Sequence, residues 1–216
     1  MTAAAPATSD ATAPSGVIAD PALRRTVLRW EIAGWLVVFF VGSFFHFIFE
    51  LSGFSTIVAP FGSVNESTWE HLKLFYWPGL AFAIAQHAYL RHRVNNFWVA
   101  KAVSAVMIPA SVAFLFYAYI GVVIPIDGKG TFLGTIVITA IAVTLGQVAA
   151  YRILVDEPYG ERARRIAIAI LVLMGVAFVV FTWAPPRIFL FENFAFYRYS
   201  GEFGILQDYT PYLVFK

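Results

Sequence analysis

Two histidines and three carboxylates lie close together in this sequence, at the junction of two long apolar stretches: His46, Glu50, Glu66, Glu70 and His71. Imidazole nitrogens and carboxylate oxygens are ligands for zinc, iron and manganese in proteins. The same groups act as general acids and bases in catalysis. Ionisable side chains next to hydrocarbon cost free energy, and they usually have a function there. This junction is therefore the first place in the chain to look for chemistry.

The spacing of these residues predicts that they meet in space. His46 and Glu50 are four residues apart, so they share one face of the first helix. A rise of about 1.5 Å per residue puts His46 roughly 9 Å inside the end of that helix, and Glu70 and His71 roughly 5–6 Å inside the start of the next. A short connection makes the two helices antiparallel neighbours. We expect His46 and His71 to face each other, with Glu50 and Glu70 within one side-chain length.

Two overlapping sets of residues follow from this expectation. The predicted ligands of a divalent metal (zinc, iron or manganese) are His46, Glu50, Glu70 and His71. The predicted acid–base groups of a reaction are Glu66, Glu70 and His71. Neither HExxH nor HxxxH occurs in the chain, so no short motif identifies the metal.

A purely structural interpretation of the same stretch stays open. Ser67 and Glu70 have the spacing of a capping box, in which both side chains bind the first amide groups of a helix. Asn65 is an alternative cap, and the helix dipole favours Glu66 near a helix start. Glu70 and Lys73 are three residues apart and can form an ion pair. In this interpretation the junction only caps and fastens two helices.

The composition indicates an integral membrane protein. Hydrophobic residues make up 60% of the chain and charged residues 13%, and 22 residues are Phe. A soluble domain has about one quarter charged residues. The formal charge of +2 is too small to indicate a nucleic-acid partner. Because the chain has no cysteine, disulfides, thiolate metal sites and cysteine nucleophiles are excluded.

The hydropathy pattern predicts an all-α bundle of about five transmembrane helices. Residues 1–22 are rich in Ala, Pro, Thr and Ser and predict a flexible tail, with Asp20 and Pro21 as a helix start. Residues 23–186 form the predicted transmembrane domain, and residues 187–216 an aromatic-rich segment too polar to span. The expected crossings lie near residues 27–52, 67–90, 98–124, 132–155 and 166–184.

Basic residues predict the orientation of these crossings. With five crossings, ten basic residues lie on one side, namely Arg24, Arg25, Arg29, Arg91, Arg93, Lys101, Arg152, Arg162, Arg164 and Arg165. Five lie on the other side, namely Lys73, Lys129, Arg187, Arg198 and Lys216. We therefore expect a protein of the bacterial inner membrane with a cytoplasmic amino terminus and an outer carboxyl terminus. The 53–66 connection and the C-terminal segment then share the outer face. We expect that segment to fold back over the polar junction, with Arg187, Glu192 and Arg198 reaching its carboxylates.

Several stretches resemble an uncharacterised family of small prokaryotic membrane proteins, domain of unknown function family 6512. The similar stretches are His46-Phe-Ile-Phe-Glu50-Leu-Ser-Gly53, Val64-Asn-Glu-Ser-Thr-Trp-Glu-His-Leu-Lys73, Pro185-Pro186-Arg-Ile-Phe-Leu-Phe191 and Gly201-Glu-Phe-Gly-Ile205. The resemblance covers most of residues 30–205 and implies a membrane-helix fold but no reaction. The chain departs from the family at Asn193, where an Asp-Pro pair is expected.

A looser likeness links the chain to the progestin and adipoQ receptor group and to alkaline ceramidases. Those membrane zinc hydrolases place an acidic residue, an Asn and a His near an early helix, and residues 66–71 are similar to a fragment of that pattern. Their late HxxxH pair is absent from this chain.

Three classes of function are compatible with these observations. The first is a metal-dependent membrane enzyme that acts on a lipid or small apolar substrate at the outer leaflet. The second is a non-catalytic accessory subunit whose aromatic faces bind other membrane subunits. The third is a small-molecule or proton-coupled transporter, which no repeat or pair of broken helices supports. The expected partners are thus the lipid bilayer and other membrane subunits, without nucleic acid.

Overall fold

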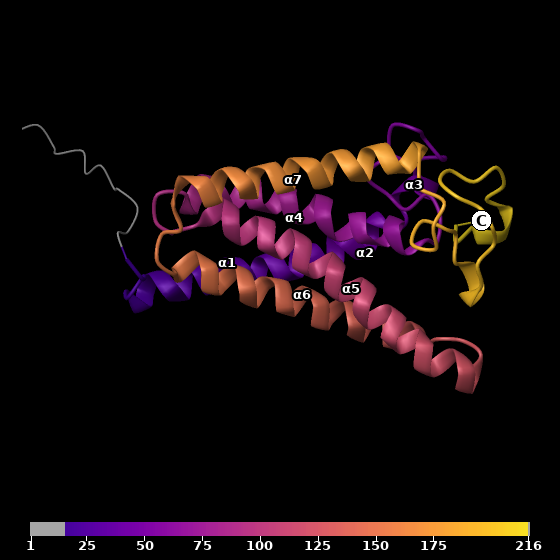
Figure 1. Ribbon diagram of the computed structural model, residues 1–216, viewed down its shortest axis with the longest axis horizontal. Coiled ribbons are helices and arrows are strands. Elements are labelled where there is room, and N and C mark those ends of the chain that lie inside the picture. The colour runs from indigo at the N-terminus through magenta and orange to yellow at the C-terminus, as the bar shows by residue number, and fades with distance from the viewer. Residues whose placement is uncertain (1–15, 216) are drawn as a thin grey trace, which may run out of the picture.

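The computed structural model describes residues 16–215, and their fold is an elongated bundle of five long helices (Figure 1). The bundle consists of α1 (Pro21–Leu36), α4 (Thr68–Leu90), α5 (Phe97–Asp127), α6 (Phe132–Val155) and α7 (Gly160–Trp183). Within residues 16–215 the only β pairing is one isolated bridge between Glu192 and Phe203. The predicted all-α bundle is therefore confirmed.

The first predicted crossing is not one continuous helix. After α1 the chain forms a π-helical turn η1 (Val37–Val41), then the short helices α2 (Gly42–Phe45) and α3 (Ile48–Leu51). Gly42 lets this part approach α4 closely, since a Cβ atom at Gly42 would lie 2.9 Å from the carbonyl oxygen of Leu74. π-Helical turns often occur near functional sites. The chain thus arrives at its polar junction in short pieces rather than along a straight helix.

The start of α1 is capped as the sequence predicts. The side chain of Asp20 accepts a hydrogen bond from the amide of Ala22 at 2.9 Å, with Pro21 at the first helical position.

Residues 1–15, most of the predicted flexible tail, lie outside the described residues. Within the rest of that tail, Ile18 is buried and donates its N–H to the carbonyl oxygen of Val155 at 2.9 Å. This part of the chain packs against the bundle.

Four stretches in the described residues are long and apolar enough to cross a membrane: Pro21–Phe45, Phe97–Asp127, Phe132–Val155 and Gly160–Trp183. Large apolar side chains on these helices are exposed, among them Phe114 at 72% and Leu173 at 67%, as lipid-facing residues would be. α4 has 23 residues, enough to span, but its sequence is more polar. Four to five apolar helices make this a membrane protein.

The polar side chains of α4 are bonded inside the bundle. Gln86 donates to a carboxylate oxygen of Glu31 at 2.7 Å, and Lys101 forms an ion pair with the same oxygen at 2.7 Å. This network joins α1, α4 and α5, and all three side chains are buried.

Lys101 is therefore a buried ion-pair partner and not a loop cation. Lys73 is buried and paired as well. Without these two lysines, the basic residues that predict the orientation number nine on one side and four on the other.

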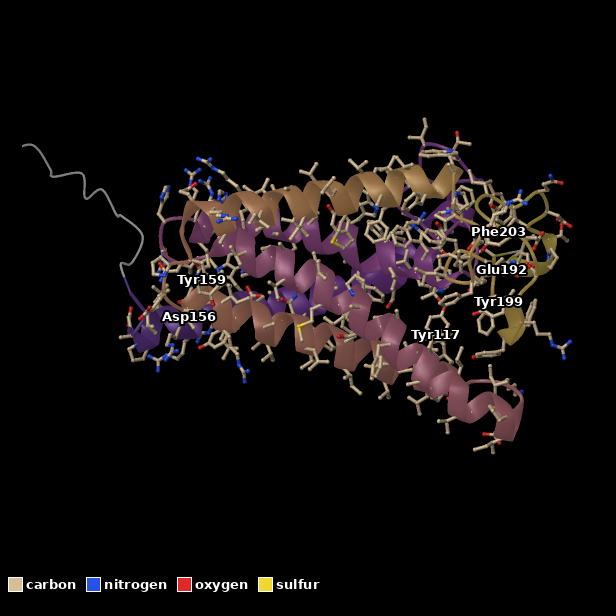
Figure 2. The ribbon with its side chains drawn as sticks, viewed as in Figure 1. Tyr117, Asp156, Tyr159, Glu192, Tyr199 and Phe203 are labelled. Carbon is tan, nitrogen blue, oxygen red and sulfur yellow. The ribbon has the colours of Figure 1, made fainter. Side chains whose placement is uncertain are left out.

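The connections of the bundle gather at two opposite ends (Figure 1). The 52–67 loop, between α3 and α4, lies at the same end as the C-terminal segment, residues 187–215. Figure 2 shows Tyr117 of α5 near this end with Glu192, Tyr199 and Phe203, whereas Asp156 and Tyr159 mark the opposite end. The loop and the segment therefore share one end, as expected.

The C-terminal segment folds back onto the 52–67 loop, which confirms that prediction. The side-chain amide of Asn65 donates to the carbonyl oxygen of Gly204 at 2.8 Å, and the Tyr209 hydroxyl donates to the carbonyl oxygen of Val64 at 3.0 Å. The ion pairs of residues 16–215 do not include Arg187 or Arg198. Hydrogen bonds, and not ion pairs with the predicted cations, fasten the segment.

The arrangement of the two ends generates a topology prediction. Because exposed arginines gather at the end that carries residues 91–96, we expect this end to be cytoplasmic and the C-terminal segment to lie outside. Reporters fused after Arg93 and after Lys216 should therefore signal from opposite sides of the membrane. Signals from the same side for both fusions would contradict the predicted orientation.

Candidate functional site

The structure brings His46, Glu66 and His71 together at the end of the bundle. Nε2 of His46 lies 3.6 Å from Oε1 of Glu66, and Nε2 of His71 lies 3.6 Å from Oε2 of the same carboxylate. The two imidazole rings have their centroids 5.1 Å apart. One ligand atom from each residue lies within 4.8 Å of the others, so the group has the size of a metal site.

Each residue of the group comes from a different element. His46 directly follows α2, Glu66 lies in the 52–67 loop, and His71 lies in the first turn of α4. The loop reaches the end of α2 because Gly62 is there; a Cβ atom at Gly62 would lie 2.7 Å from the side chain of Ile48. A larger residue would push the loop, and with it Glu66, away from His46.

The start of α4 fixes the orientation of His71. Nδ1 of His71 lies 2.8 Å from the carbonyl oxygen of Ser67. A carbonyl oxygen only accepts, so Nδ1 carries the proton and donates this bond. In the neutral ring Nε2 then presents a lone pair to the carboxylate of Glu66. Two acceptors facing each other repel, so this position attracts either a proton or a cation.

Glu66 is held through its backbone by a residue far along the chain. The amide of Glu66 donates to Oδ1 of Asn193 at 3.0 Å, and Asn193 is fully buried. The amide of Ser67 donates to Oδ1 of Asn65 at 2.7 Å. The C-terminal segment thus positions the loop residue between the two histidines. In the sequence, Asn193 stands out only as a departure from the family pattern.

Glu70 lies outside the histidine group. Its carboxylate forms an ion pair with Lys73 and accepts the amide of Val64 at 2.9 Å. Lys73 is fully buried and also donates to the carbonyl oxygen of Ala59 at 2.8 Å. Successive helical residues point about 100° apart, so Glu70 and His71 face different neighbours. The structural interpretation therefore describes Glu70 better than the ligand interpretation.

Glu50 lies beside the group but contacts the C-terminal segment. Its carboxylate oxygens accept the amide of Val214 at 3.0 Å, and one of them accepts the amide of Phe215 at 2.6 Å. A cavity of about 50 Å³ separates this contact from the histidine group, and Glu50, His46 and Glu66 all line it. Of the predicted ligands, His46 and His71 meet, Glu50 adjoins them, and Glu70 turns away.

Only one of the two hydrogen bonds of the predicted capping box forms. Ser67 is the N-cap of α4, and its hydroxyl accepts the amide of Glu70 at 3.3 Å. The reciprocal bond is replaced, since Asn65 and not Glu70 accepts the amide of Ser67. Both residues that the structural interpretation proposed as caps are used, and together they leave Glu66 free to face the histidines.

The charges in the group influence one another strongly. Burial alone would raise the pKa of Glu66, but the close approach of His46 and the positive charges of both histidines outweigh it and lower this pKa to about 2. Burial alone would lower the pKa of His46, but the nearby negative charge of Glu66 raises it above its usual 6.5. In the absence of metal, Glu66 is an anion and His46 is easily protonated.

A comparison with protein families gives one match over most of the chain. The model of a family described as "Family of unknown function (DUF6512)" matches residues 22–205. No match was found among curated proteins or among solved structures. The likeness to adipoQ-type receptors and alkaline ceramidases gains no support from these comparisons.

The two pKa shifts predict a pH profile for the metal-free protein. The depressed pKa of Glu66 contributes stability above about 4.5, which is lost as the pH falls toward about 2. The raised pKa of His46 contributes stability below 6.5, which is lost as the pH rises through that raised value. With chelator present, the unfolding temperature should be highest between these limits, and Glu66→Gln should flatten the profile. An equally flat profile for the exposed Glu161→Gln control would contradict this origin.

Asn193 provides a second prediction. Its side-chain amide donates to a Glu202 oxygen at 3.2 Å and to the Tyr212 hydroxyl at 3.1 Å. Asn193→Asp loses these donors and places two carboxylates together, so it should destabilise the fold by about 1–3 kcal/mol. Adding Glu202→Gln restores a donor between the two positions and should recover part of the loss. Denaturation of the single and double variants measures this, and additive losses would count against the interaction.

Proposed function

Since the chain belongs to this family of unknown function, we propose its function from the site itself: it is a membrane enzyme that binds one divalent transition metal through His46, Glu66 and His71. We further propose that residues 23–186 form its membrane domain and residues 187–216 an outer segment, in a bacterial inner membrane. The substrate is a lipid or a small apolar molecule that reaches the site at the outer end of the bundle.

The spacing of the donor atoms is the observation that carries this proposal. Donors about 2.0–2.2 Å from a tetrahedral zinc lie roughly 3.3–3.6 Å apart. Each histidine nitrogen lies 3.6 Å from a different Glu66 oxygen, and one ligand atom from each residue lies within 4.8 Å of the others. A closure of about 1 Å would bring the three groups to the spacing that an ion requires. Two histidines and one carboxylate leave a fourth position open, as in catalytic zinc sites.

The hydrogen bond behind His71 supports a metal in preference to a chance cluster. Metal-bound histidines usually donate their other ring N–H to a carbonyl or carboxylate, which fixes the tautomer and the ring. His71 donates Nδ1–H to the carbonyl oxygen of Ser67 at 2.8 Å, leaving Nε2 for the ion. The alternative occupant is a proton, which would join Glu66 and one histidine as a simple ion pair.

The surroundings of the site define the chemistry that we propose. A metal in this position would lower the pKa of a bound water and supply a hydroxide for hydrolysis. The cavity beside the group is lined by Glu50, which can take a proton from such a water, and by Phe47, Phe49 and Phe54. In this scheme Glu66 and His71 act as ligands, and Glu70 keeps its structural role. The aromatic lining favours an apolar substrate.

A second candidate function is that of an accessory membrane subunit. Exposed aromatic residues on the C-terminal segment favour it, because Phe196 is 76% exposed and Phe189 56% exposed. In this alternative the segment binds another membrane protein, and the histidine group is only an ion pair. Purification with a second protein in fixed stoichiometry, without metal, would favour this function.

Elemental analysis of the purified protein tests whether it binds a metal. We expect about one equivalent of zinc, iron or manganese, and loss of stoichiometric binding in His71→Ala and Glu66→Gln, each of which removes one of only three ligands. His92→Ala, at the opposite end and exposed, is the matched control and should bind as the wild type does. Absence of metal from the wild type after supplementation with each ion, or binding unaffected by both site variants, would overturn the proposal.

A further inference from the structure

Residues 209–215 cross over the cavity beside the histidine group. Tyr209, Tyr212, Leu213 and Val214 line it from one side, and His46, Glu50 and Glu66 from the other. The cavity of about 50 Å³ holds only a few water molecules. Any substrate larger than that needs the residues after Tyr209 to move away.

One end of this stretch is fixed firmly. The Tyr209 hydroxyl donates to the carbonyl oxygen of Val64 at 3.0 Å and accepts the amide of Leu206 at 2.9 Å. The Tyr209 ring stacks on Phe54 with centroids 4.5 Å apart and contacts the buried Phe49 edge-on. Tyr209 is therefore an anchor that remains in place when the residues after it move.

The other end is fixed by few contacts. Val214 is 58% exposed and Phe215 is 51% exposed, so neither contributes much buried area. Phe215 meets Phe47 edge-on with ring centroids 5.6 Å apart. The remaining attachment is the carboxylate of Glu50, which accepts the amides of both residues. Segments with little burial and solvent-exposed hydrogen bonds open most readily.

We propose that residues 213–215 form a strap that closes the cavity beside His46 and Glu66, with Tyr209 as its anchor and Glu50 as its catch. Release of the two amides from Glu50 lets the strap swing about residues 210–212 and opens the cavity to the outer end of the bundle. The role of the cavity as a substrate site rests on the proposed function, whereas the opening of the strap does not depend on it.

The absence of cysteine from the chain allows a direct test. Ser63 lines the cavity and is only 9% exposed, so Ser63→Cys places a single thiol behind the strap. Adding Glu50→Ala should raise the rate of reaction with a small water-soluble thiosulfonate by at least about tenfold, because two charge-assisted hydrogen bonds are lost. Glu192→Ala is the matched control, since Glu192 accepts the Gly201 amide at 2.8 Å elsewhere in the C-terminal segment. Equal rates in all three proteins would overturn the strap.

A second measurement needs no thiol. Chymotrypsin should cut after Tyr212 or Leu213 faster in Glu50→Ala than in the wild type or in Glu192→Ala, and unchanged cleavage would also overturn the strap. Neither readout depends on metal. A protein that binds no metal but opens with Glu50→Ala would retain the strap and lose the proposed enzyme. A protein that binds metal with unchanged labelling and cleavage would retain the enzyme and lose the strap.

Discussion

A buried ion pair between Glu70 and Lys73 holds together the end of the molecule that carries the site. Lys73 also donates to the Ala59 carbonyl and to the Thr182 hydroxyl of α7, while Glu70 accepts the Val64 amide. The pair thus fastens the 52–67 loop to α4 and α7 at once. Removal of one partner from such a pair typically costs about 3–5 kcal/mol, because the other charge stays buried. Only with the loop fastened in this way does Glu66 reach between the two histidines.

The same physical constraint explains how a polar helix belongs to a membrane bundle. A charged or amide side chain facing lipid costs several kcal/mol, whereas the same group bonded inside the protein costs much less. Gln86 and Lys101 both donate to Glu31, so the carboxylate is neutralised and bonded within the bundle. α4 can therefore lie among the apolar helices although it is more polar than the four stretches that are apolar enough to cross a membrane.

Sequence reasoning predicted the helices well because long apolar stretches dominate the chain; the expected crossing at 132–155 coincides with α6. It also placed His46 opposite His71, since a short loop leaves two helices little choice but to be antiparallel neighbours. It did not predict the π-helical turn at Val37–Val41, because the five residues of this turn are all apolar and carry no local signal for it. It predicted Glu70 as a metal ligand beside the two histidines, whereas the structure places Glu66 there. The path of a loop depends on distant contacts, here on Asn193, which lies 127 residues beyond Glu66.

In the proposed site, a metal and protons would compete for the same lone pairs. A histidine binds a metal only when its nitrogen is deprotonated, so metal binding releases protons and strengthens as the pH rises. Glu66 acts on both sides of this competition, because its negative charge raises the pKa of His46 and also attracts a cation. His71 is already prepared for a metal, since its Nδ1 proton is used by the Ser67 carbonyl. If the proposed metal binds, His46 is therefore the residue whose proton it must displace, and the ion-pair and metal-bound forms would be two states of one site.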